Sequence, residues 1–142
     1  MASSLIAFLD SSALIYYFEG TPLYRHAVLT VLREIKVSNP QAVVAISRLG
    51  VMECRVKPLR EGNLVLLEHY EAFFEQAQIV ELSPAIVDVA TQLRASTALK
   101  TPDAIQAACA LSFTEPCTFV TGDAGFARVS KLIVRQVVVT LA

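Results

Sequence analysis

The sequence predicts an α/β layered fold built on a mostly parallel sheet. Short apolar runs alternate with longer amphipathic patterns along the 142-residue chain, and three of the apolar runs contain almost no polar residue. Strands that are covered on both faces show such continuous apolar runs, and crossovers of helical length join parallel strands. The expected strands are residues 5–9, 43–46, 79–81, 118–121 and 137–141.

Caps and prolines mark the helices expected between these strands. Thr21 precedes a proline at the first helical turn, and so do Ser83 and Thr101. Ser47 caps a further helix, which we expect Pro58 to end. The expected helices are residues 11–18, 22–36, 47–57, 63–76, 84–98 and 101–113.

The chain is 54% hydrophobic, with a mean hydropathy of +0.52. Even so, it has no uncharged apolar stretch as long as a membrane span, so we expect no membrane association. Asp10 and Glu19 interrupt the first apolar segment and no basic residue precedes it, so it is a poor signal peptide. The length predicts one domain over residues 1–142.

The formal net charge of −1 argues against nucleic-acid binding through bulk positive charge alone. It leaves open an enzyme that binds a nucleic acid locally. Cys54, Cys109 and Cys117 are odd in number and lack metal-ligand spacing, so we expect reduced core thiols in a cytoplasmic protein.

Four carboxylates are expected at one edge of the sheet. Asp10 follows the first strand, and Asp123 follows the fourth. Glu53 falls in the second turn of the helix after the second strand, and Asp103 falls in the first turn of the helix "TPDAIQAACAL". Strand carboxyl ends share an edge with the N-termini of the helices that leave them, and ligands bind at that edge.

Clustered carboxylates repel one another unless a cation neutralises them. Hard oxygen ligands of this kind suit Mg²⁺ or Mn²⁺, and helix N-termini at the same edge offset part of the negative charge. One or two such ions could activate a water and stabilise an in-line displacement at a phosphodiester. The residues therefore predict metal-dependent phosphodiester hydrolysis.

Each acid also has a purely structural interpretation. Asp10 could cap the helix that begins at Ser11, and Glu53 could pair with Lys57 one helical turn later. Asp103 could complement its helix dipole, and Asp123 could be a turn residue. The convergence of all four at one edge favours a single site over four coincidences.

Other polar residues are assigned smaller roles. Ser12 and Thr121 could orient water or carboxylates, whereas His26 and His69 lie in amphipathic helices away from the site. A basic rim beside the acids could hold an RNA backbone, and a solvated helix face is the alternative. The residues of this basic rim are Arg48, Arg55, Lys57 and Arg60.

Four segments in this order, "FLDSSALI", "SRLGVMECRVKPLREG", "KTPDAIQAACAL" and "FVTGDAGF", resemble the PIN-domain ribonucleases, in particular the VapC-type toxins of bacterial toxin–antitoxin pairs. The resemblance implies a three-layer α/β/α sandwich. It also implies Mg²⁺- or Mn²⁺-dependent endonucleolytic cleavage of RNA such as tRNA or rRNA. Its metal-binding and catalytic acids would be Asp10, Glu53, Asp103 and Asp123, supported by Ser12 and Thr121.

The resemblance further implies a homodimer and a small antitoxin that covers an apolar groove. PIN domains with other cellular roles carry the same acids, so a non-toxin nuclease is an alternative. A haloacid-dehalogenase-type phosphatase would need a second Asp where this chain has Ser12. A response-regulator receiver would need a paired acid and a late Lys that are not found, and an inactive α/β adaptor would use the acids only as caps.

Overall fold

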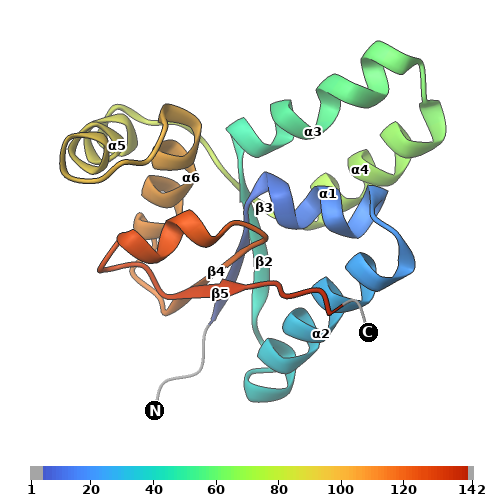
Figure 1. The fold of residues 1–142 in the computed structure, drawn as a ribbon, viewed down its shortest axis with the longest axis horizontal. Coiled ribbons are helices and arrows are strands. Elements are labelled where there is room, and N and C mark those ends of the chain that lie inside the picture. The colour runs from blue at the N-terminus through green and yellow to red at the C-terminus, as the bar shows by residue number, and fades with distance from the viewer. Residues whose placement is uncertain (1–4, 141–142) are drawn as a thin grey trace.

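The computed structural model describes residues 5–140 and contains a five-stranded sheet in the order β3-β2-β1-β4-β5 (Figure 1). Every strand pair in the described range is parallel. The strands are β1 (Ile6–Leu9), β2 (Val43–Ser47), β3 (Gln78–Val80), β4 (Cys117–Thr121) and β5 (Val134–Gln136). The predicted parallel α/β class is confirmed.

Helices cover both faces of the sheet (Figure 1). On one side lie α1 (Ser11–Glu19), α2 (Pro22–Ser38), α3 (Arg48–Glu61) and α4 (Leu64–Gln76). On the other lie α5 (Pro84–Ser96), α6 (Thr101–Leu111) and the 3₁₀ helix η1 (Ala124–Arg128). This arrangement gives the three layers that the family resemblance implies.

The burial of both faces of β1 explains why its sequence is apolar throughout. Ala7 and Leu9 pack into the core on the α1–α4 side, whereas Ile6 and Phe8 pack into the core on the α5–α6 side. Successive side chains of a strand point to opposite faces, so a strand with two covered faces needs apolar residues at every position.

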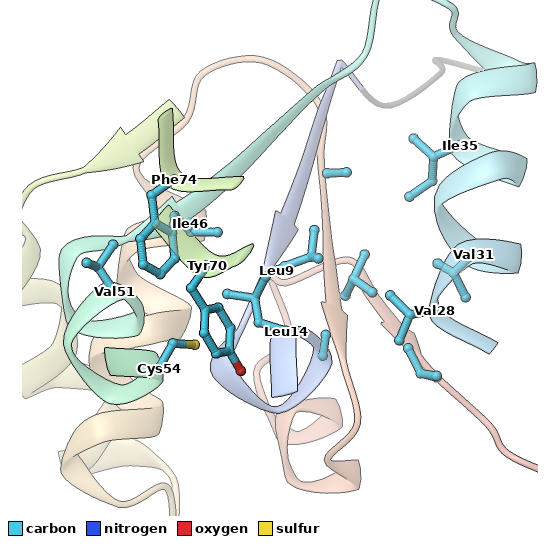
Figure 2. Packing of buried hydrophobic residues seen from close by; sticks show 14 of the residues in the cluster. Leu9, Leu14, Val28, Val31, Ile35, Ile46, Val51, Cys54, Tyr70 and Phe74 are labelled. Carbon is cyan, nitrogen blue, oxygen red and sulfur yellow. The ribbon is translucent and has the colours of Figure 1, made fainter. Parts of the chain in front are cut away.

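The core on the α1–α4 side joins strands β1, β2 and β4 to four helices. Figure 2 shows Leu9 of β1 and Leu14 of α1 close to Tyr70 of α4, with side chains of α3 beside them. Val28, Val31 and Ile35 of α2 pack into the same cluster. Their spacing by three and four residues is the apolar stripe that the sequence predicts for this helix.

The predicted end of α3 is wrong. The helix passes through Pro58 and ends at Glu61, because Gly62 adopts a left-handed conformation with φ of 65°. The N–H groups of Gly62 and Asn63 then donate to carbonyls of the last turn, at Leu59 and Pro58. Proline removes one helical hydrogen bond, and the surrounding helix tolerates that loss here.

The last predicted strand is also misplaced. Strand β5 comprises Val134–Gln136, and residues 137–140 lie outside it; residue 141 lies outside the described part of the chain. The β4 ladder stops at the pair Thr121–Gln136, and Val137 adds one backbone hydrogen bond to Thr121. An apolar sequence needs a neighbouring strand to become a strand, and β4 ends there.

In the described part of the chain no helix is both long enough and apolar enough to cross a membrane.

The left-handed backbone conformation of Gly62 should be the only reason why a substitution there changes the free energy of unfolding. An added Cβ would have no atom within 4 Å, so Gly62→Ala introduces strain without a clash. We expect Gly62→Ala to lower the stability by about 1 kcal/mol in urea denaturation. Gly62→Asn is the matched control and should cost less, because Asn tolerates the left-handed region. Equal stability of Gly62→Ala and wild type would contradict this explanation.

Candidate active site

Asp10 lies directly after β1 and is buried, with only 4% of its surface exposed. The hydroxyl groups of Thr121 and Ser12 donate to its two oxygens, at 2.5 Å to Oδ2 and 2.7 Å to Oδ1. The backbone N–H of Ala13 also donates to Oδ1, at 3.0 Å, so Asp10 caps α1. The cap interpretation and the site interpretation of Asp10 therefore apply to the same side chain.

The register of the sheet brings these groups together. Leu9 pairs with Val120, and the N–H of Asp10 donates to the Val120 carbonyl. Asp10 and Thr121 are consequently neighbours at the carboxyl ends of β1 and β4. The Ser12 hydroxyl also accepts the Gly122 N–H at 2.8 Å, which joins the start of α1 to the loop after β4.

Glu53 lies in the second turn of α3 and is half-buried. Its Oε1 accepts a hydrogen bond of 2.5 Å from the Ser11 hydroxyl and one of 3.1 Å from Gln106 Nε2. Lys57, the predicted partner of Glu53, pairs with Glu19 instead, at 3.2 Å. An exposed ion pair along the helix therefore does not account for Glu53.

Asp103 and Asp123 complete the group of acids. Asp103 is half-buried in the first turn of α6, whose N-cap residue Lys100 makes no side-chain cap hydrogen bond. Asp123 is exposed and caps η1, because its Oδ1 accepts the Gly125 N–H at 2.8 Å. The turn interpretation of Asp123 is thus part of its structural role.

Asp103 is the acid that interacts electrostatically with the other three. Burial raises the pKa of Asp103 above its ordinary value, and the charges of Asp123 and Glu53 raise it further, while Lys100 lowers it. Burial also raises the pKa of Asp10, against three hydrogen bonds that lower it, and the Asp103 charge adds to the rise. Residues distant in sequence therefore form one acidic site at the carboxyl edge of the sheet.

The chemistry of this donor set fits a hard divalent cation. All four groups offer carboxylate oxygens, and those of Asp103 accept no hydrogen bond among those found in residues 5–140. In that range no three or more His, Cys, Asp or Glu side chains are grouped so that they could hold a metal ion, so the fit lies in the donor chemistry alone. A cation would relieve the repulsion that raises the pKa of Asp103.

Three of the four residues in the predicted basic rim already have acidic partners. Arg48 pairs with Glu81, Arg55 pairs with Glu71, and Lys57 pairs with Glu19. Arg60 forms no ion pair with any residue that the structure describes. These pairs reduce the net positive charge that the rim offers to an RNA backbone.

The cysteines lie outside the group of acids. Cys54 and Cys109 are buried, Cys117 is half-buried, and none of them forms a disulfide. Burial raises the pKa of the Cys54 thiol to about 12 and that of Cys109 to about 11. These thiols are protonated at neutral pH and serve as apolar core residues, as predicted.

Two residues beside Glu53 were missed by the sequence-based interpretation. The sequence pattern places Ser11 only at the start of a helix and gives Gln106 no role. Gln106 is 2% exposed and makes three side-chain hydrogen bonds, so it is not a surface amide. Its position three residues after Asp103, on the same face of α6, is the signal that could have identified it.

Asp10→Asn should distinguish the effect of the helix cap from that of the negative charge, because asparagine still accepts the Ala13 N–H but is neutral. The pKa of Asp10 is raised in the folded state, so the ionised group destabilises the protein at neutral pH. The penalty disappears as the pH falls through the folded-state pKa toward the ordinary value of 3.8. In chelator, we therefore expect Asp10→Asn to be at least as stable as wild type at pH 7.

Urea denaturation of wild type and Asp10→Asn between pH 7 and pH 3.8 measures the difference in their free energies of unfolding. We expect this difference to narrow as the pH falls. Asp10→Ala is the control that removes the cap, and it should lose about 1 kcal/mol relative to Asp10→Asn. A large loss of stability in Asp10→Asn at pH 7 would mean that the charge itself stabilises the fold.

Comparison with solved structures identifies the fold. The chain resembles VapBC2 of Rickettsia felis bound to a promoter DNA fragment, with 21% identity, TM-score 0.72, and coverage of 92% of this chain and 98% of that chain. A toxin–antitoxin complex of Klebsiella pneumoniae gives 23% identity, TM-score 0.71, and coverage of 94% and 99%. VapBC-5 of Mycobacterium tuberculosis gives 19% identity, TM-score 0.62, and coverage of 95% and 99%.

No curated protein matches the sequence at a significant level. The family model described as "PIN domain" matches residues 7–132, which include all four acids and the hydroxyls that bind Asp10. This match agrees with the resemblance that the four sequence segments indicate. The chain belongs to the PIN domain family.

Proposed function

We propose that this protein is a metal-dependent endoribonuclease and the toxin of a type II toxin–antitoxin pair. The observation that carries the proposal is the electrostatically coupled group of Asp10, Glu53, Asp103 and Asp123 in a PIN-family chain. The reaction is hydrolysis of RNA phosphodiester bonds. The likeness in fold to VapBC toxin–antitoxin structures supports the toxin assignment.

In this proposal the four acids hold Mg²⁺ or Mn²⁺. The bound ion would supply an activated water and would stabilise negative charge on the phosphodiester. The hydroxyls of Ser12 and Thr121 keep the Asp10 carboxylate in one orientation by donating to both of its oxygens. The N-terminus of α6, close to Asp103, adds positive potential where the negative charges of acids and phosphate meet.

A protein partner is the second part of the proposal. An apolar groove of about 420 Å³ runs along α3, and its lining includes Met52, Val56, Leu59 and Leu82. All four side chains are more than 40% exposed, which is unusual for large apolar residues on an isolated surface. We assign such surface to contacts with a small antitoxin and with a second copy of the chain in a homodimer.

RNA contact by Arg48, Arg55, Lys57 and Arg60 also belongs to the proposal. Because three of them have carboxylate partners, we expect the metal site to contribute more to RNA binding than this rim does. The protonated, unbridged thiols support a reducing compartment, so we place the protein in the cytoplasm.

Incubation with total cellular RNA tests the nuclease assignment. Wild-type protein with Mn²⁺ should produce discrete fragments, and either chelator or Asp103→Ala should reduce cleavage by at least about 100-fold. Asp88→Ala is the matched control, because Asp88 is an exposed aspartate of α5, and it should cleave like wild type. Intact RNA in every lane, from folded and antitoxin-free protein, would overturn the nuclease assignment.

A thermal-shift titration tests the metal site without RNA. A cation that binds only the folded state raises the melting temperature by mass action, and relief of carboxylate repulsion adds to that binding. We expect millimolar Mn²⁺ to raise the melting temperature of wild type and of Asp88→Ala. Asp103→Ala should show a much smaller rise. Absence of any rise for wild type would contradict the site, whatever the outcome of the RNA assay.

A further inference from the structure

A chain of hydrogen bonds runs from the start of α3 to Glu53 through the buried side chain of Gln106. The Gly50 N–H donates to Ser47 Oγ at 2.8 Å, and Ser47 Oγ lies 2.7 Å from Gln106 Oε1. Gln106 Nε2 then lies 3.0 Å from Ser11 Oγ and 3.1 Å from Glu53 Oε1. The chain thus joins α1, α3 and α6.

In this chain of hydrogen bonds, each donor has only one acceptor left to it. Ser47 Oγ already accepts from Gly50, so its own proton goes to Gln106 Oε1. The amide oxygen of Gln106 is thereby held toward Ser47, and both Nε2 protons are available on the other side. One is donated to Glu53 and the other to Ser11. The Ser11 hydroxyl in turn donates its own proton to Glu53 at 2.5 Å.

Two groups therefore donate hydrogen bonds to the same oxygen of Glu53. Oε1 receives both hydrogen bonds, and no hydrogen bond found in residues 5–140 reaches Oε2. Hydrogen bonds to an anionic acceptor are the stronger kind and hold its plane in place. Glu53 therefore presents a fixed carboxylate with one oxygen available to a cation.

Packing around the amide leaves little freedom for it to turn. A Cβ at Gly50 would lie 3.3 Å from Ser47 Oγ, a tight approach, and 3.5 Å from Gln106 Nε2, an ordinary van der Waals contact. Gln106 itself is 2% exposed and lies in α6. A buried amide with every polar atom paired is restricted to one orientation.

We propose that Gln106 and Ser11 are positioning residues that orient Glu53 for the divalent cation. This inference rests on the proposed function, and it assigns to the pair a role in metal affinity rather than in contact with the metal or the RNA. Groups that hydrogen-bond a metal ligand from behind commonly change metal affinity by about 10- to 100-fold when they are removed.

Gln106→Met tests the role, because methionine has a similar length and no hydrogen-bond donor. We expect its apparent affinity for Mn²⁺, from the thermal-shift titration, to fall by about tenfold or more. RNA cleavage at low Mn²⁺ should fall in parallel and should recover as the Mn²⁺ concentration is raised. Gln92→Met on the exposed face of α5 is the matched control and should behave like wild type.

Ser11→Ala is the second variant, and it keeps the test decisive if Gln106→Met fails to fold. It removes the other donor at a half-buried position and should also weaken Mn²⁺ binding. In a Glu53→Gln background, neither substitution should change Mn²⁺ affinity further, since both act through Glu53. A structural role alone would change the melting temperature in chelator without this dependence on Glu53.

The outcomes separate this inference from the proposed function. The positioning role would be overturned if the folded variants bound Mn²⁺ as tightly as wild type. It would also be overturned if Ser11→Ala had the same effect in the Glu53→Gln background as in wild type. In either case the nuclease assignment stands. Failure of the wild type itself to bind Mn²⁺ or cleave RNA would overturn the proposed function, and the positioning role with it.

Discussion

The buried carboxylate of Asp10 is the constraint that organises the candidate site. A charge at this depth must be compensated, and three donors do so from α1 and from the end of β4. The Ala13 contact caps α1. The same two hydroxyl groups join α1 and β4 to the loop that carries Asp123, because Ser12 accepts the Gly122 N–H and Thr121 accepts the Asp123 N–H. The register of β1 and β4 brings these two parts of the chain together, and the hydrogen bonds of the buried acid hold them in place.

The site also contains a conflict that its surroundings only partly resolve. Asp103 lies near Asp123 and Glu53, and burial together with their charges raises its pKa. The N-terminus of α6 and Lys100 offset some of this repulsion. What remains is a repulsion among acids that a bound cation would relieve under the proposed function. The network behind Glu53 then determines how that carboxylate is presented.

Much of the fold follows from local sequence patterns. Apolar runs, caps and prolines were sufficient to predict four of the five strands and the start of each α-helix to within about two residues, whereas the 3₁₀ helix η1 was not predicted. The errors lie where a local signal competes with its surroundings. Pro58 is a strong helix breaker, yet α3 continues to Glu61 and ends because of the left-handed conformation of Gly62. The apolar segment after Gln136 has a strand-like sequence, but β4 offers it no further partner.

The sequence by itself determined the α/β class and predicted the four acids and the edge at which they meet, because these depend on short-range patterns and on the geometry of parallel strands. Only the tertiary structure decided which side chains contact them. Lys57 pairs with Glu19 rather than Glu53, and Gln106 reaches Glu53 from another helix. Such contacts join residues far apart in the chain, and helix packing sets them, which no local pattern records.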